Sequence, residues 1–207
     1  MIMNIYKDYG KRFFDLTFVL LLSPLLSLII VLISAIQVFF YGVKIFYLQE
    51  RHTKNAKVFK LIKFKTMLDT YDQFGNLLPD RYRITKFGEF LRASSLDETP
   101  NFVNVLVGHL SIVGPRPLPI KFYGLMSNRQ RKRYHVRSGI TGLAQINGRN
   151  ALSWKNKLNI DLAYCKKVKL SIDVKIIVKT IFVLAKNNKN DALFDQGIDN
   201  YSPDFKS

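Results

Sequence analysis

The longest apolar stretch of the chain lies near the N-terminus, where no charged residue occurs between Leu16 and Val43. A helix that crosses a bilayer needs about 20 apolar residues at roughly 1.5 Å per residue, so this stretch is long enough. A cleaved signal peptide has an apolar core of about 7–15 residues that ends at small residues. This stretch is longer and ends in the aromatic cluster Phe39–Tyr41, which argues against a signal peptide. We therefore predict a membrane anchor over residues 1–43.

A proline inside the apolar stretch predicts a bend. Pro24 removes a backbone donor and clashes with the preceding turn, and Ser23 can bond the carbonyl that loses its partner. Basic residues flank the stretch on both sides, whereas a spanning helix keeps its basic flank on the cytoplasmic side. The flanking residues are Lys7, Lys11, Arg12, Lys44, Arg51, Lys54 and Lys57. Together these features favour a re-entrant (monotopic) helix, bent near Ser23-Pro24, that enters and leaves by the cytoplasmic face. A straight span over Leu25–Val43 stays open as the alternative.

Residues 44–186 combine short segments of several kinds, which predicts one α+β domain that is mainly helical with a few short strands. Lys57–Lys65 alternates apolar and basic residues, the period of a strand. Thr99-Pro100 has the types expected at the N-cap and first position of a helix. Helices are expected at 84–91, 101–107, 127–135 and near 172–186, and loops or turns at 71–79, 114–117, 138–142 and 147–150.

The last two segments have a distinct polarity. The helix near 172–186 is amphipathic, which suits either a helix lying on a bilayer or an ordinary helix packed on the core. Residues 187–207 are polar and rich in Asn and Asp, which predicts a mobile tail.

Charge narrows the classes of partner. The chain has 207 residues with 32 Lys and Arg against 15 Asp and Glu, a formal net charge of +17. This excess predicts an anionic partner: nucleic acid, an acidic membrane surface or a phosphorylated small molecule. The lone Cys165 excludes an internal disulfide framework, and with three scattered histidines the chain has no zinc-type cluster.

The acidic residues are distributed very unevenly. Asp97-Glu98 is the only adjacent acidic pair, and no acidic residue follows it until Asp161. The stretch between them is strongly basic. A carboxylate pair beside such a stretch suits a phosphate ligand with a divalent metal. Ser95-Leu96-Asp97-Glu98 also matches a helix capping box, and spacing alone leaves both interpretations open.

Single residues add less. Arg116 stands between two prolines, and Arg149 lies in a glycine-containing loop where backbone can approach a ligand. Trp154 is more typical of a core or membrane-interface residue than of a stacking platform. Nothing marks His109, His135 or Cys165 as a ligand or nucleophile.

Several short motifs occur in a fixed order. They are Lys11-Arg12 and Asp15 before an apolar helix with Ser-Pro, Lys63-Phe64-Lys65-Thr66-Met67, Ser95-Leu96-Asp97-Glu98, Gly114-Pro115-Arg116-Pro117, Gly139-Ile140-Thr141-Gly142 and Gly148-Arg149-Asn150. Over residues 7–186 the chain resembles the monotopic phosphoglycosyl transferases, the bacterial sugar transferase family, in their minimal catalytic form. The five motifs from Lys63 to Asn150, in this order, are far more specific than any one of them.

The resemblance implies a ping-pong reaction at the cytoplasmic face of the bacterial inner membrane. A UDP-sugar gives its sugar-1-phosphate to Asp97 and releases UMP, and the phosphosugar then passes to undecaprenyl phosphate to begin a surface glycan. Glu98 matches the Mg²⁺ ligand. Lys63, Arg92, Arg116, Arg149 and Asp161 match other active-site positions, which we assign to substrate binding. Membrane lipid and downstream glycosyltransferases are the other expected partners, and nucleic acid is not expected.

The chain departs from the family pattern in a few places. Ser138 replaces a proline, Val107 and His109 replace Lys and Asp, and Glu50-Arg51-His52-Thr53 lacks Pro-Gly. Asn147–Asn150 followed by Ala151 and Trp154 resembles relatives that use N-acetylated sugars. The alternatives are a membrane-anchored basic module that binds nucleic acid or anionic lipid, and a catalytically degenerate scaffold. No recognised nucleic-acid pattern supports the first.

Overall fold

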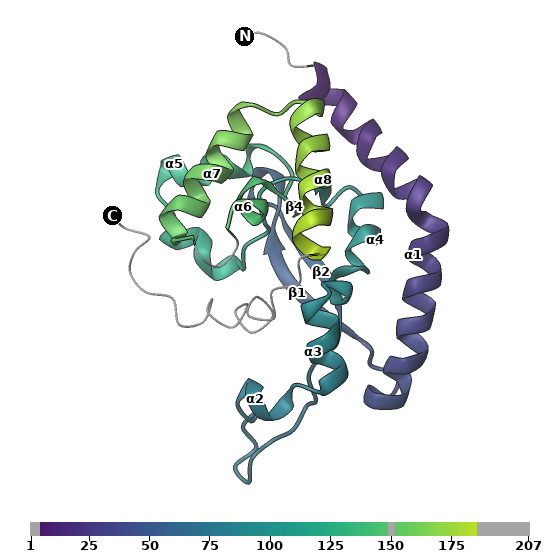
Figure 1. Ribbon diagram of the computed structural model, residues 1–207. Helices are drawn as coiled ribbons and strands as arrows, with labels where there is room; N and C mark the ends of the chain where they lie inside the picture. The colour runs from purple at the N-terminus through teal and green to yellow at the C-terminus, as the bar shows by residue number, and fades with distance from the viewer. Residues whose placement is uncertain (1–4, 149–151, 186–207) are drawn as a thin grey trace.

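The computed structural model describes residues 5–148 and 152–185. Arg149 and the predicted tail at 187–207 lie outside the described residues. Within them the fold is α+β and mainly helical with short strands, as the sequence predicts. Figure 1 shows the long α1 on one side of the molecule, α5, α6 and α7 on the other, and α4 and α8 between them.

The described residues form eight α-helices and four short strands. The α-helices are α1 (Lys11–Tyr41), α2 (Asp80–Arg83), α3 (Lys86–Ala93), α4 (Asn101–Leu106), α5 (Asn128–Arg131), α6 (Leu143–Ile146), α7 (Trp154–Lys166) and α8 (Leu170–Ala185). The strands are β1 (Phe46–His52), β2 (Val58–Phe64), β3 (Ser111–Val113) and β4 (Gly139–Thr141). Short 3-10 turns include η3 (Leu96–Glu98) and η5 (Lys132–His135).

Helix α1 continues through its proline and changes direction along its length (Figure 1). Pro24 has no N–H to donate to the carbonyl of Leu20, and the Ser23 hydroxyl donates to that carbonyl at 2.8 Å. Ser27 donates to the carbonyl of Ser23 at 2.6 Å. The serine bond expected beside Pro24 is therefore present.

The N-terminal end of α1 is fastened to the rest of the fold by buried charges. Lys11 Nζ lies 2.6 Å from Asp173 Oδ2 on α8, and both side chains are buried. Asp15 accepts a hydrogen bond of 2.9 Å from the Ser111 hydroxyl on β3. Buried charges need such partners, because an unpaired one is strongly unfavourable.

The C-terminal end of α1 returns to the same body. The Gln37 amide donates to the Lys65 carbonyl at 2.8 Å, and the hydroxyls of Tyr41 and Thr85 lie 2.6 Å apart. Between the two ends, α1 exposes Leu20, Leu21, Leu25, Leu28 and Val31 away from the body. Both ends of the apolar helix therefore meet one domain.

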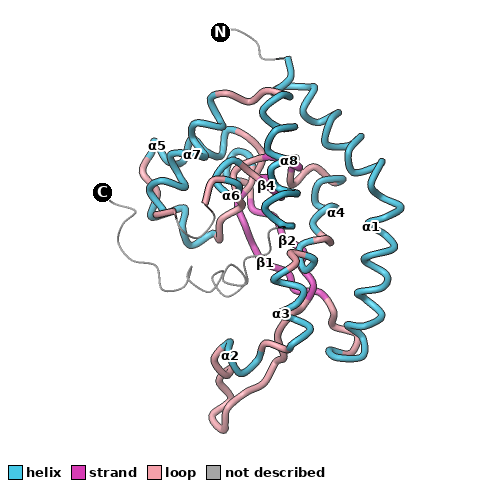
Figure 2. Tube along the Cα trace, viewed as in Figure 1, coloured by secondary structure: helices cyan, strands magenta, loops and turns pink. Residues whose placement is uncertain are grey.

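Two small sheets lie among the helices (Figure 2). β1 and β2 pair antiparallel from Phe46↔Phe64 to His52↔Val58, and β3 pairs with β4 in parallel. The alternation predicted for β2 is present, since Phe59 and Leu61 enter the core while Val58 and Lys60 are exposed.

Three local expectations differ from the structure. The segment 127–135 divides into the short α5 and the 3-10 turn η5, and the loop at 138–142 contains β4. Thr99 does not cap α4, because its hydroxyl donates to the Leu96 carbonyl and Pro100 occupies the N-cap. β4 forms because Gly139 passes so close to Gly114 that a side chain would clash with backbone.

Candidate active site

A cavity of about 1280 Å³ opens beside Asp97 and Glu98. Its polar part is formed by residues of β1, β2, α3 and η3 together with Arg116. Its apolar part is formed by side chains of α1, α4 and α8, namely Phe18, Leu22, Phe102, Ile177, Ile181 and Leu184. The carboxylate pair therefore lies where a charged surface meets an apolar one.

The backbone at the carboxylate pair is a 3-10 turn preceded by a left-handed residue. Ser95 has φ 58° and ψ 18° and makes no side-chain capping bond. The capping-box interpretation is therefore wrong, because Ser95 precedes the turn without making a side-chain capping bond. Asp97 is 7% exposed, so the turn inserts a carboxylate into the wall of the cavity.

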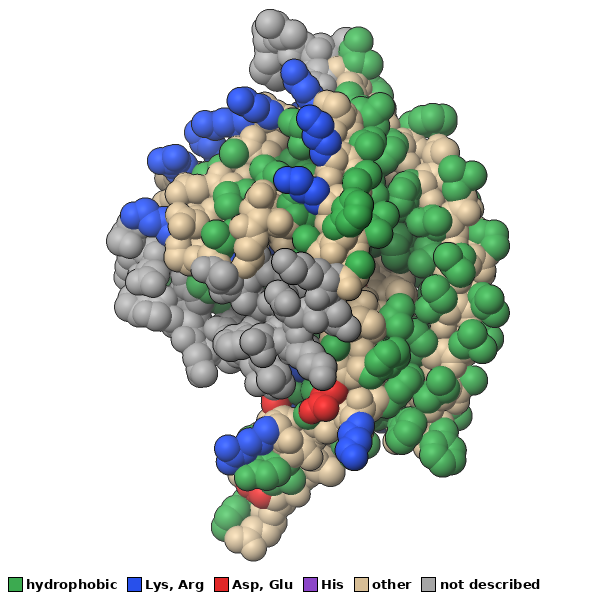
Figure 3. All heavy atoms as spheres, in the orientation of Figure 1, with side chains coloured by type: hydrophobic (Ala, Val, Ile, Leu, Met, Phe, Trp, Pro, Cys, Tyr) green, Lys and Arg blue, Asp and Glu red, His purple; other side chains and the backbone are tan. Residues whose placement is uncertain are grey.

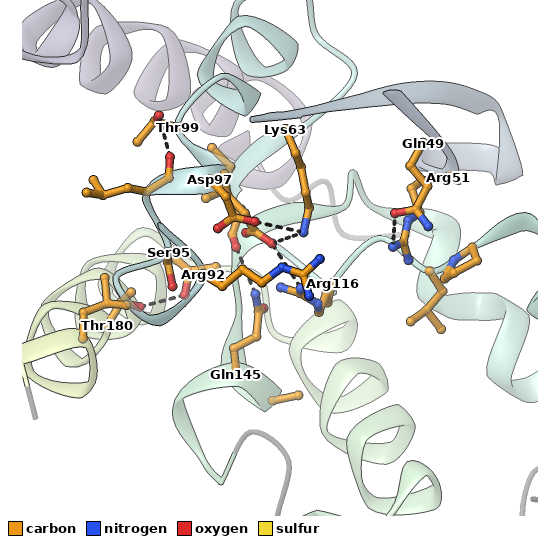
Figure 4. A pocket seen from close by; sticks show the side chains of 18 of the residues that line it. Gln49, Arg51, Lys63, Arg92, Ser95, Asp97, Thr99, Arg116, Gln145 and Thr180 are labelled. Carbon is orange, nitrogen blue, oxygen red and sulfur yellow. Dashed lines mark hydrogen bonds and ion pairs between the residues drawn. The ribbon is translucent and has the colours of Figure 1, made fainter. Parts of the chain in front are cut away.

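Two cations converge on these carboxylates (Figure 4). Lys63 Nζ on β2 lies 2.8 Å from Glu98 Oε1 and 3.8 Å from Asp97 Oδ2. Arg116 Nη2 lies 3.1 Å from the same Glu98 oxygen. The structure thus brings together Lys63, Asp97, Glu98 and Arg116, which the sequence places in separate motifs.

The other predicted site residues take different places. Arg92 lines the cavity from α3, and its Nε donates to the Thr66 hydroxyl at 2.9 Å. Asp161 also borders the cavity, but its Oδ2 accepts from Arg133 Nη2 at 2.7 Å. Substrate binding by Arg92 and Asp161 stays a prediction, and Arg149 lies outside the described residues.

Sequence reasoning missed two buried arginines beside the site. Arg51 on β1 is 5% exposed and Arg133 on η5 is 1% exposed. A weak signal existed for Arg133, because Asp161 is the first acidic residue after a long basic stretch and needs a cation if it is buried. The sequence pattern does not indicate which of the many basic residues pairs with Asp161.

The carboxylates at the site fit a Mg²⁺ ion that is held jointly by the protein and by substrate phosphates. The described part of the chain contains no group of three or more His, Cys, Asp or Glu that could hold a metal. Mg²⁺, however, is commonly held by one or two carboxylates together with substrate phosphates. Asp97 and Glu98 match that pattern, whereas they would not match a closed all-protein site.

An apolar surface extends over α1, α4 and α8 (Figure 3). Residues Tyr6–Tyr41 form the only helix, among those described, that is long and apolar enough to cross a membrane. Only 11% of its most apolar window is buried, unlike the core helix of a soluble domain. Exposed apolar side chains on the other two helices are Val103, Leu106, Leu170, Val174, Val178, Ile181 and Phe182.

Helix α8 packs on the core with one face and exposes apolar residues on the other. Its inner face enters the core through Ile176, and its Thr180 hydroxyl lies 2.7 Å from that of Thr141. Its outer face carries the exposed apolar residues together with Lys175 and Lys179. That outer composition is typical of a helix at a membrane surface.

Known proteins are similar in sequence to most of this chain. The sequence profile of the bacterial sugar transferases matches residues 6–187. The chain is 44% identical over 171 residues to "Uncharacterized sugar transferase EpsL" of Bacillus subtilis (strain 168), covering 83% of this chain and 85% of that protein. It is 35% identical over 193 residues to "Exopolysaccharide production protein ExoY" of Rhizobium meliloti (strain 1021), covering 83% and 84%.

A longer relative carries a more specific name. The chain is 38% identical over 148 residues to "UDP-glucose:undecaprenyl-phosphate glucose-1-phosphate transferase" of Xanthomonas campestris pv. campestris. That match covers 66% of this chain and 30% of the longer protein. The profile match and these relatives show that the chain belongs to the bacterial sugar transferase family.

Proposed function

We propose that the chain transfers a sugar-1-phosphate from a UDP-sugar to undecaprenyl phosphate, releases UMP and so begins the synthesis of a surface glycan. One observation carries the proposal: the Asp97-Glu98 pair, with Asp97 buried and with Lys63 and Arg116 beside it, borders a cavity that also has an apolar wall from α1, α4 and α8. A charged donor and a lipid-linked acceptor need such a meeting of polar and apolar walls. The family and the printed names of its members support the reaction class.

The transfer proceeds in two steps with Asp97 as nucleophile. A carboxylate oxygen of Asp97 attacks the phosphorus that bears the sugar, and the bond from that phosphorus to the bridging oxygen breaks, which releases UMP. An oxygen of undecaprenyl phosphate then attacks the same phosphorus and frees the Asp97 carboxylate. Covalent catalysis of this kind divides one difficult transfer into two easier ones.

Lys63 and Arg116 supply positive charge where several anions meet. They already lie against Glu98 at 2.8 and 3.1 Å, so they need little rearrangement when phosphates arrive. Such preorganised charge stabilises a transition state more than charge that must first be oriented. Glu98 would hold Mg²⁺, which when bound neutralises phosphate charge. Arg92, at the cavity wall, would bind a donor phosphate.

We further propose that α1 is re-entrant and that the domain lies at the cytoplasmic face of the inner membrane. Support comes from the contacts at its two ends, where Lys11 meets Asp173 and Gln37 meets the Lys65 carbonyl of one domain. A straight span would separate these ends by the full bilayer. A tag at residue 1 should be shielded from periplasmic protease; cleavage there, with the body protected, would contradict re-entry.

For the donor we propose an N-acetylated UDP-sugar, on the resemblance of the residues at 147–154. UDP-glucose belongs in the same panel, since it occurs in the name of the Xanthomonas relative. The readout is UMP release by the purified full chain in detergent, with Mg²⁺ and with or without undecaprenyl phosphate. Lipid-dependent release with one sugar identifies the donor; no release with any donor would contradict the proposed reaction.

The decisive variant is Asp97→Asn, with Glu89→Gln as a matched control. Glu89 is an exposed carboxylate on the neighbouring α3, so its loss leaves the cavity unchanged. Asp97→Asn should lower UMP release by about 10⁴-fold or more, since removal of a nucleophile has effects of that order. Equal activity of the two variants would exclude Asp97 as the nucleophile.

A further inference from the structure

The segment that carries Arg116 is held by its backbone carbonyls. Pro115, Pro117 and Pro119 have no N–H, so this segment cannot pair as an ordinary strand. Its carbonyls nevertheless need partners where they are buried. How they find them determines how firmly the Arg116 side chain is placed.

Each carbonyl from Pro115 to Leu118 accepts a hydrogen bond from a different part of the chain. Those of Pro115 and Leu118 accept from the backbone amides of Gly139 and His52, at 3.0 and 3.3 Å. The two central carbonyls accept from guanidinium groups instead. Arg133 Nη2 donates to the Arg116 carbonyl at 2.7 Å, and Arg51 Nη1 donates to the Pro117 carbonyl at 3.2 Å.

Arg133 is itself fixed by Asp161. Its Nε and Nη2 lie 3.2 and 2.7 Å from Asp161 Oδ2, and the two side chains are 1% and 6% exposed. Burial disfavours the charge on Arg133, but Asp161 and Tyr134 together outweigh that effect, so the pKa of Arg133 stays above its usual value. A charged guanidinium with both edges engaged can hardly move.

We propose that Arg51 and Arg133, the latter oriented by Asp161, are positioning residues that hold the Arg116 guanidinium against Glu98. Asp161 then acts through Arg133 and the Arg116 backbone, not through the substrate. We call the hydrogen bonds from Arg51 and Arg133 to the Pro117 and Arg116 carbonyls the clamp. The contribution of the clamp to catalysis rests on the proposed function, whereas the existence of the clamp does not. The two parts are tested separately.

Hydrogen–deuterium exchange tests the clamp without any substrate. The relevant amides are those of Arg116 and Leu118, because the neighbouring positions are prolines. Arg133→Lys keeps a positive charge for Asp161 but loses the fork that reaches the Arg116 carbonyl. Exchange at Arg116 and Leu118 should become about five- to tenfold faster, the order expected for one lost hydrogen bond.

Arg137→Lys is the matched control, because Arg137 Nε donates to the Gly108 carbonyl at 3.0 Å, away from Arg116. It should leave the two amides unchanged. If Arg133→Lys does not fold in detergent, Arg51→Lys tests the same clamp through the Pro117 carbonyl. Unchanged exchange in a folded clamp variant, or equal acceleration in the Arg137 control, would overturn the clamp even if the chain is not a transferase.

A double-mutant cycle tests the positioning role. With Arg116 present, Arg133→Lys should lower kcat/KM by about 10- to 100-fold, the range seen for small misplacements of catalytic groups. With Arg116→Ala, the same change should lower it by less than about twofold further. Equal losses in both backgrounds would mean a general structural role and would overturn the positioning claim. Absence of any turnover in the unaltered protein would instead contradict the proposed function, with the exchange result still deciding the clamp.

Discussion

Two clusters of charged side chains in this molecule have similar composition but different surroundings. At the base of the anchor, Asp173 is fully buried and both its carboxylate oxygens are occupied, by Lys11 and Tyr6 on one and Tyr164 on the other. At the cavity, Glu98 remains 18% exposed at its side chain and faces an open volume of about 1280 Å³.

The difference shows how to separate a structural ion pair from a catalytic one. In the anchor cluster of Lys11, Tyr6, Tyr164 and Asp173, both carboxylate oxygens already accept hydrogen bonds from within the cluster, which leaves little room for a ligand. At the cavity, Lys63 and Arg116 meet Glu98 beside an open volume that has room for phosphates. Activity should therefore depend on the second cluster, and folding stability on the first.

Between these two clusters, the larger effect on turnover is expected at the cavity. Glu98→Gln removes the charge on which Lys63 and Arg116 converge, and should lower turnover by about 10²–10³-fold, typical for an electrostatic group in a site. The melting temperature in detergent should hardly change, since Asp97 still lies 3.8 Å from Lys63. Thermal melting and UMP release on one preparation check this. A large drop in melting temperature would make Glu98 a structural residue.

The anchor cluster should give the opposite result. Asp173→Asn removes the carboxylate that lies 2.6 Å from buried Lys11, which should destabilise the fold by about 3–5 kcal/mol. For a chain of this size, each kcal/mol of lost stability lowers the melting temperature by roughly 2–4 °C. Turnover per folded molecule should stay near that of the unaltered chain.

The control for that experiment is Asp80→Asn. Asp80 pairs with Arg83 at 3.5 Å, but its side chain is 49% exposed, so its loss should change stability by about 0–1 kcal/mol. Similar melting temperatures for the two variants would contradict a special role for the buried cluster.

The smallest effect concerns the single thiol. Burial raises the pKa of Cys165 to about 12, because the thiolate is disfavoured away from water. The folded chain at pH 8 should therefore resist maleimide labelling, and labelling should appear on unfolding. Rapid labelling of the native protein would show that the core beneath α7 is more open than described.

Pattern and composition predict much of the fold. The apolar stretch and Pro24 predict the bent helix, and alternation from Lys57 predicts β2, because these are local periodicities. The strand β4 could not be predicted, since three residues at Gly139–Thr141 become a strand only by pairing with β3. The split of 127–135 likewise reflects tertiary packing around buried Arg133.

The site divides in the same way. The uneven distribution of acids singles out Asp97 and Glu98, and the motif order adds Lys63 and Arg116. Ser95 in a left-handed conformation could not be inferred, since serine seldom adopts it. The pairing of Arg133 with Asp161 joins residues on separate elements, and no spacing rule selects that arginine among its basic neighbours.

The central claim is that Asp97 carries the phosphosugar between donor and acceptor. The most direct test is intact mass spectrometry of the full chain after incubation with the active UDP-sugar and Mg²⁺ but without undecaprenyl phosphate. We predict a mass increase equal to one sugar phosphate, located on the peptide that contains Asp97 and lost when the lipid is added. The absence of any adduct under conditions that release UMP, or an adduct that persists in Asp97→Asn, would contradict the account.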